Sequence, residues 1–444
     1  MTNSLPDLHG HLCVLKKQLL DSVLKTPYAA LEPPRIFIKA TLISLLLEES
    51  SVTDFALACA LLSSSRSSIH ELLIWIPNHL STAAETAFSD LAKAYNDAVW
   101  VGEKRNLAAE LMPEIVPVLK DKIKVSLIDS DETYKCFYAI LAACQCRWLV
   151  SQIASPDLDE MVNLIIPWGL TCLDHWSPEV KRQGMISFIH VAKNVKGGAL
   201  DSYGAAILYA CRQNIASTDE IWQYLVEMSA LLVSCIQRDN PRSLWFHKIL
   251  TEMLSHLERQ PRNIERRIAW LKFIEPIFNS MRLLLSPYFG RIFPLFFQWL
   301  HVNDDETVVL VLKRLHTIVR LTWIRKSLYF DRLVDELVVA YKEAVPRKAR
   351  EEIENDILNL LIMLQQCLGL QFETAWNKHT SDLDVTILNR RLFVSRDYYL
   401  QSDRPKFFQP LRIDGPKEVS EPKAEERKSK PEKTKIDDPS PSWS

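Results

Sequence analysis

Polar turns recur along the chain at nearly constant intervals, and this regularity constrains the fold more than any other feature. The turns are rich in Asp, Asn, Ser, Thr and Pro, and apolar segments with helical spacing follow them. Successive turns are separated by 49, 47, 45, 45, 43, 42 and 42 residues. A period of this length, with two helices in each unit, is typical of HEAT and armadillo repeats. The turns are marked by Pro33, Thr82, Asp129, Asp174, Asp219, Arg262, Asp304 and Pro346.

The apolar segments after the turns have side chains three or four positions apart, which places them on one face of a helix. At the start of one segment, Ser177 is a predicted cap and Pro178 the first helical residue, while Ser217 and Glu220 have capping-box spacing. Gly184 is predicted to face inward, where leucine would overpack the neighbouring helices and alanine would be tolerated. Its stripe consists of Val180, Gly184, Phe188, Val191 and Val195.

These helical pairs predict an all-α fold. One pair cannot bury its own apolar stripe, so neighbouring pairs must stack. Gly accounts for only 10 of 444 residues, which disfavours multi-strand sheets and phosphate-binding loops. We therefore predict an α-solenoid of about eight HEAT/armadillo-like helical hairpins over residues 1–380. Residues 381–410 are predicted to form a C-terminal cap or docking segment. Residues 411–444, with eight basic and eight acidic side chains, are predicted to be a disordered polyampholyte tail.

Charge and cysteine content limit the partners that the chain is expected to have. The formal net charge of −2 provides no global attraction to nucleic acid or anionic lipid. The first eight residues lack the pattern of a secretory signal. No uninterrupted apolar run approaches the ~18 residues of a membrane span. The nine Cys lie in apolar runs and suit free thiols in a reducing compartment. We expect a cytoplasmic or nuclear protein that binds neither nucleic acid nor membrane.

The sequence contains no convincing catalytic, cofactor or metal site. Cys136, Cys144 and Cys146 resemble a metal cluster, but residues two apart on a helix point in different directions. We therefore interpret these three residues as buried thiols. Nucleotide-binding glycine loops and hydrolase or zinc-protease motifs are missing from the sequence. The prediction is a protein that is not an enzyme and that carries no cofactor.

Short basic clusters allow two interpretations. On a solenoid they could align into a groove for an acidic peptide or a phosphate, or they could form a solvated face, which we favour. The clusters consist of Arg262, Arg266 and Arg267 and of Lys313, Arg314, Arg320, Arg325 and Lys326.

The turn at Asp174 also carries a tryptophan, and Trp is a favoured anchor for protein partners. The turn, with Asp174, Trp176, Lys181 and Gly184, resembles the Tel-two-interacting protein family, which provides the smaller helical subunit of the Triple-T (TTT) cochaperone complex. His175 departs from the family pattern, in which a second acidic residue is usual. The resemblance extends over about residues 110–330. We expect Asp174, Trp176 and Lys181 to contact a partner, with Lys181 at an exposed helix start.

The resemblance implies a non-enzymatic scaffold. Triple-T proteins act with the heat-shock chaperone machinery to mature and stabilise phosphatidylinositol-kinase-related kinases (PIKKs), which include TOR and the DNA-damage checkpoint kinases. A second hypothesis is a generic HEAT/armadillo adaptor, such as a transport receptor or scaffold. A hypothesis of a different class is a metal- or nucleotide-dependent enzyme, which metal analysis and nucleotide-binding assays would test.

Overall fold

A computed structural model describes residues 8–26, 33–47, 49–64, 73, 76–98, 106–128, 133–325 and 327–392. Every regular element in these residues is helical, and the predicted α-solenoid is confirmed. The predicted tail, residues 411–444, lies outside the described residues, as does all of the predicted cap segment after residue 392. The proposed domain boundaries therefore remain predictions.

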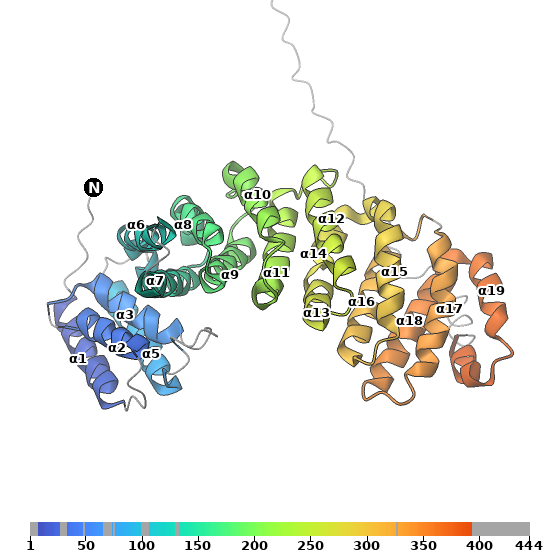
Figure 1. Cartoon of the computed structure of the whole chain (residues 1–444), viewed down its shortest axis with the longest axis horizontal. Helices are drawn as coiled ribbons and strands as arrows, with labels where there is room; N and C mark the ends of the chain where they lie inside the picture. Colours follow the sequence, from blue (N-terminus) through green and yellow to red (C-terminus); the bar gives the residue numbers. More distant parts are fainter. Residues whose placement is uncertain are drawn as a thin grey trace, which may run out of the picture. The chain divides into compact units, whose positions relative to one another are not determined.

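From residue 107 onward the helices form two layers, with each first helix of a pair followed by a second helix (Figure 1). The first helices are α6 (Leu107–Ile128), α8 (Asp157–Asp174), α10 (Gly204–Asn214), α12 (Leu244–Arg259), α15 (Phe289–Leu300), α17 (Leu328–Glu343) and α19 (Leu370–Trp376). The second helices are α7 (Thr133–Ser151), α9 (Pro178–Asn194), α11 (Asp219–Ile236), α13 (Ile264–Phe273) with α14 (Glu275–Met281), α16 (Asp305–Thr322) and α18 (Arg350–Leu368). Within each layer, successive helices pack against one another.

The N-terminal part contains α1 (His9–Lys25), α2 (Pro33–Leu45), α3 (Val52–Ser64) and α5 (Asn78–Ala98). Helix α5 packs against α1 and α3, and α3 packs against α7. The core is therefore continuous from the N-terminal helices α1, α3 and α5 into the layer of second helices. Short 3₁₀ segments complete the described chain: η1 (Asp201–Tyr203), η2 (Arg282–Tyr288), η3 (Asn377–His379) and η4 (Leu383–Val385).

Most of the predicted turns separate helices as expected. The turns at Asp174, Asp219, Arg262, Asp304 and Pro346 all lie between a first helix and the following second helix. The turn predicted at Ser81-Thr82 is wrong, because both residues lie inside α5. The turn predicted at Asp129 lies outside the described residues.

Side-chain caps explain why several second helices begin where they do. Asn263 accepts a hydrogen bond from the backbone N–H of Arg266 at 3.1 Å, and Asp304 accepts one from that of Thr307 at 3.2 Å. These bonds satisfy donors that the first turn of a helix leaves free. Ser177 precedes Pro178 as predicted, but its side chain makes no capping bond. The predicted capping box is also wrong, since Thr218 and not Ser217 precedes α11, and without a side-chain cap.

The buried core consists of apolar side chains from both layers, with large aromatic rings at its centre. Trp168, Trp222, Trp270 and Trp299 are fully buried. Trp270 packs edge-on against Trp299, with 6.2 Å between ring centroids. Such contacts hold one repeat against the next, because the two rings belong to α13 and α15.

Polar bonds join neighbouring repeats at both edges of the helical stack. We call the edge formed by the turns from a first to a second helix the capped edge, and the edge formed by the other turns the opposite edge. At the capped edge, Arg266 pairs with Asp219 and Arg347 with Asp305. Each bond joins residues more than forty positions apart, so it ties one repeat to the next.

None of the described helices combines the length and apolar character that crossing a membrane would require.

Candidate protein-binding site

The turn between α8 and α9 holds two of the predicted contact residues at the surface. Asp174 ends α8 and is exposed, and 54% of the Trp176 side chain is accessible. Between them, His175 is fully buried. The turn thus presents a carboxylate and an indole on either side of an anchored imidazole.

His175 anchors the turn to the preceding repeat. Its Nδ1 accepts a hydrogen bond from the backbone N–H of Ser177 at 3.0 Å, so the proton of the neutral ring is on Nε2. Nε2 lies 2.8 Å from Oγ of Ser126, a residue of α6, and donates to it. Burial, with a smaller effect of Lys181, lowers the pKa of His175 to about 4. The ring is therefore uncharged at neutral pH.

Trp176 lies over this fixed imidazole. The two rings are stacked with 5.3 Å between centroids and an angle of 25°. The indole Nε1 points toward the carbonyl oxygen of Ser126 at 3.5 Å, the long limit for a hydrogen bond. One face of the indole is thus held in place, while the rest of the side chain remains available to a partner. A rigid, half-exposed Trp loses little conformational entropy on binding.

Lys181 differs from the sequence-based expectation. Its side chain is half-buried, and Nζ donates a 2.7 Å hydrogen bond to Oδ1 of Asn214, at the end of α10. Burial lowers the pKa of Lys181, and the nearby Asp174 opposes this shift. Lys181 therefore links two repeats and is not a freely exposed charge. Its predicted contact with a partner remains a prediction.

The cysteines proposed as buried thiols lie in α7. Cys144 and Cys146 are fully buried, and Cys136 is partly buried. Burial raises the pKa of Cys144 to about 12 and holds that of Cys146 well above its usual value. Thiols in this state are poor nucleophiles and poor metal ligands. Among the described residues, no three His, Cys, Asp or Glu side chains gather in a way that could hold a metal ion.

Three residues of the basic clusters fit neither interpretation, because they line no groove and are not solvated. Arg266, Arg267 and Arg314 are all buried. Arg267 donates from Nε to Oγ1 of Thr307 at 3.0 Å, and Arg314 pairs with Glu275. These arginines join neighbouring second helices, because Arg267 of α13 bonds to a residue of α16, and Arg314 of α16 pairs with a residue of α14. Arg262 and Arg325 are exposed.

No family model matches the chain. The chain is 47% identical to the Arabidopsis thaliana protein named "Uncharacterized protein At2g39910" over 422 residues, which cover 89% of this chain and 97% of that protein. It is 22% identical to the Mus musculus "TELO2-interacting protein 2" over 239 residues, which span 50% of this chain and 46% of the mouse protein.

Among solved structures, an engineered protein aligns with 88% of this chain and 98% of its own length. The sequence identity is 13% and the TM-score is 0.43. The match to the plant protein covers nearly all of both chains, and almost half of the aligned residues are identical. The chain therefore belongs to the family of the Arabidopsis thaliana protein At2g39910.

Proposed function

We propose that this helical-repeat scaffold is a non-enzymatic protein-binding adaptor, and that it is a subunit of a Triple-T-like cochaperone complex. Its role there would be to help mature and stabilise PIKKs together with the chaperone machinery. The observation that carries the proposal is the turn at Trp176, where a rigid exposed indole lies within the segment that resembles the Tel-two-interacting family. The 22% identity to the mouse TELO2-interacting protein supports the same assignment.

The proposed mechanism is the holding of partners on an extended surface. A helical stack exposes more surface for its mass than a compact domain, and neighbouring repeats can bind different proteins. A scaffold that holds an immature kinase away from aggregation and proteolysis raises the amount of that kinase without changing its synthesis. The proposal places the protein in the cytoplasm or nucleus, where the kinases and chaperones are found.

A generic HEAT/armadillo adaptor is the second candidate. It is favoured by the extent of the match to the mouse protein, which spans only about half of each chain. Under this alternative the scaffold binds other protein partners, such as transport cargo, through the same kind of surface.

Affinity purification from native cells separates the two candidates. We expect homologues of TELO2 and of the other Triple-T subunit to co-purify with the tagged full chain. We also expect depletion to lower the amounts of several PIKKs while their transcripts stay constant. If neither result is obtained, the Triple-T assignment is wrong and the generic adaptor remains.

The variant Trp176→Ala tests whether the turn takes part. Most of the indole is exposed, so the melting temperature is expected to change little, whereas recovery of the Triple-T subunits is expected to fall about tenfold, as for an interface anchor. Tyr209→Ala is the matched control, because Tyr209 lies on α10 with 56% of its side chain exposed. Equal recovery with both variants would remove Trp176 from the interface.

A further inference from the structure

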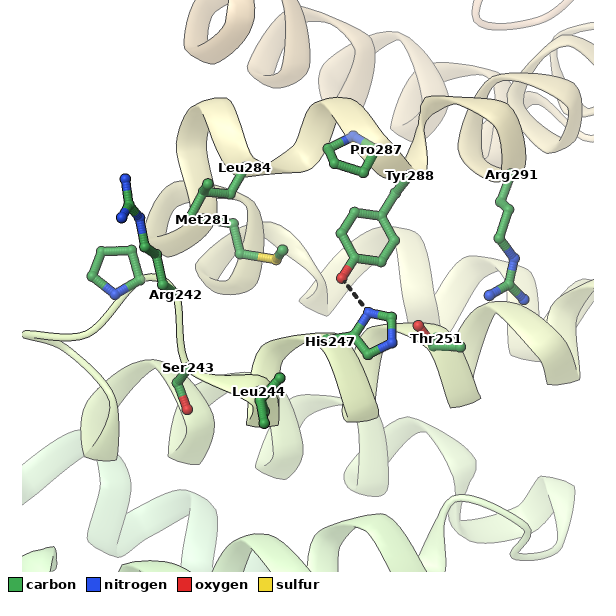
Figure 2. A pocket seen from close by; sticks show the side chains of 11 residues that line it. Arg242, Ser243, Leu244, His247, Thr251, Met281, Leu284, Pro287, Tyr288 and Arg291 are labelled. Carbon is green, nitrogen blue, oxygen red and sulfur yellow. Dashed lines mark hydrogen bonds between the residues drawn. The ribbon is translucent and has the colours of Figure 1, made fainter.

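A pocket of about 480 Å³ lies at the opposite edge, between the start of α12 and η2 (Figure 2). Leu244 forms one wall, and Leu284 and Pro287 form the other. The His247 Nδ1 and the Tyr288 hydroxyl meet across the pocket at 2.8 Å and close one side. The pocket is therefore lined mainly by apolar side chains, and it is large enough for one or two apolar side chains.

The charges around this pocket are positive. Arg242 and Arg291 stand at its two ends (Figure 2), and no carboxylate lines it. Arg291 is neutralised by Glu258 through bonds of 2.7 and 2.6 Å. Arg242 is exposed and forms no ion pair with any residue that the structure describes. A ligand for the pocket would thus meet an apolar surface beside one uncompensated guanidinium.

An exposed arginine without an ion pair recurs in each of the next two turns of the opposite edge. Arg282 and Arg325 are exposed and make no ion pair within the described chain. Beside Arg325, the side chains of Ile324 and Leu328 are 58% and 87% exposed. The turns adjoin one another, since η2 packs against α16 and α15 packs against α17. Three arginines without an ion pair, Arg242, Arg282 and Arg325, therefore lie along the same edge as the exposed apolar side chains of Leu244, Ile324 and Leu328.

The backbone at the pocket is also unusual. Arg282 has φ +50° and ψ −120°, a conformation that residues other than glycine rarely adopt. It ends α14 and directs the chain into η2, which carries Leu284 and Pro287. Backbone strain of this kind tends to persist at binding sites. The backbone conformation of Arg282 is a separate observation from the charge pattern, and it lies at the same edge.

The capped edge provides the contrast. There the buried arginines Arg266 and Arg267 have acidic or hydroxyl partners. At the opposite edge Arg238 pairs with Asp201 and Asp239, whereas Arg242, Arg282 and Arg325 have no such partner among the described residues. An exposed apolar row flanked by unpaired charge of one sign marks a surface complementary to a partner. Phosphate-backbone binding is less favoured, because the chain as a whole is slightly acidic.

We propose that the opposite edge, from Arg242 to Leu328, binds an extended protein segment in which acidic and large apolar residues are interleaved. An apolar side chain of the segment enters the pocket between Leu244 and Pro287. Its carboxylates pair with Arg242, Arg282 and Arg325. The inference rests on the proposed function only in taking a protein as the partner, and it assigns the chemistry that this partner must present.

Fluorescence anisotropy with the purified full chain tests the proposal. The probe is a labelled synthetic peptide in which Glu alternates with Leu, compared with a peptide in which Gln replaces every Glu. We expect the Glu peptide to bind about tenfold more tightly than the Gln peptide, and its affinity to fall as salt screens the charges. We expect Arg242→Glu and Leu244→Ser each to weaken binding of the Glu peptide about tenfold.

Arg262→Glu and Val345→Ser are the matched controls, because both residues are exposed at the capped edge. Three results would overturn the proposal. The control variants could weaken binding of the Glu peptide as much as Arg242→Glu and Leu244→Ser do, the Gln peptide could bind as tightly as the Glu peptide, or labelled oligothymidylate could bind more tightly than the Glu peptide. The assay does not depend on the Triple-T assignment. If the Glu peptide binds as expected but no Triple-T subunit co-purifies, only the proposed cochaperone role fails. If the subunits co-purify but the peptide does not bind, only this edge assignment fails.

Discussion

Gly184→Leu is expected to lower the free energy of unfolding by about 3 kcal/mol, near the upper end of the usual cost of overpacking. Helices α8 and α9 approach closely at this position, and a Cβ atom on Gly184 would lie 2.7 Å from Cβ of Cys172 and 3.3 Å from the carbonyl oxygen of Gly169. Neither atom is the end of a flexible side chain. The larger side chain can be accommodated only if the two helices move apart. A lower denaturation midpoint in urea would measure the effect.

Gly184→Ala is also expected to be destabilising, which corrects the expectation from the sequence. Alanine is favoured over glycine in a helix by about 1 kcal/mol, but a Cβ at 2.7 Å from another Cβ forces a backbone shift. We expect a net loss of about 1 kcal/mol, since overpacking costs about 1–3 kcal/mol. Gly10→Ala in α1 is the control, because its added Cβ would meet no atom within 4 Å. A Gly184→Ala variant as stable as the wild type would show that α8 and α9 separate easily.

Acidification is expected to destabilise the protein through His175. The unfolded imidazole has a pKa near 6.5, whereas burial lowers the pKa in the folded chain to about 4. Between these two values the unfolded state binds a proton that the folded state does not. Stability is therefore complete above pH 6.5 and falls toward pH 4 by about 1.4 kcal/mol per pH unit, at most about 3 kcal/mol in total.

The difference between the wild type and His175→Gln isolates this effect. Urea unfolding at pH 7.5 and pH 5 should show that the variant is less stable than the wild type at the higher pH and that this gap narrows by about 2 kcal/mol at the lower pH. His247→Gln, which removes an exposed imidazole, controls for the loss of any histidine. Parallel loss of stability in the wild type and His175→Gln would mean that the buried imidazole does not control the response to acid.

The fold could be predicted because a solenoid repeats a local pattern. The spacing of the turns and the helical stripes depend on residues close together in the sequence, and these patterns identified the stack of helices. The one misplaced turn has a local cause. Ser81 and Thr82 are polar residues typical of turns, but the Thr82 hydroxyl donates to the carbonyl oxygen of Asn78 at 2.9 Å within α5. In the middle of a helix, a serine or threonine hydroxyl can donate a hydrogen bond to the backbone carbonyl four residues earlier in this way.

The site could be predicted only in part, because its contacts join distant parts of the chain. Trp176 was identified from its place in a turn. The burial of His175 depends on Ser126 in the preceding pair, and the burial of Lys181 depends on Asn214 in the next pair. No local pattern contains these distances. The bond from His175 to Ser126 places an uncharged ring in a position where a carboxylate would be buried.

The sequence also contains a signal for the opposite edge, which the spacing of the turns does not reveal. Ser243-Leu244-Trp245-Phe246 and Ser327-Leu328-Tyr329-Phe330 have the same form, Ser-Leu-aromatic-Phe, at the start of first helices. The Phe is buried in both, whereas the Leu is 70% exposed in one and 87% exposed in the other. A helix start that needs only its Phe for the core leaves the Leu free for another role.

Contacts between neighbouring repeats set the spacing of the helices at both edges of the stack. Polar bonds such as Arg347–Asp305 at the capped edge and Gln371–Asp331 at the opposite edge are directional and weaken steeply once their atoms separate beyond hydrogen-bonding distance. Apolar contacts are not directional, so Leu244 can slide past Leu284 and Pro287 at lower cost. A segment bound between these side chains would therefore set the distance between α12 and η2, and so the spacing at which neighbouring repeats present their surfaces.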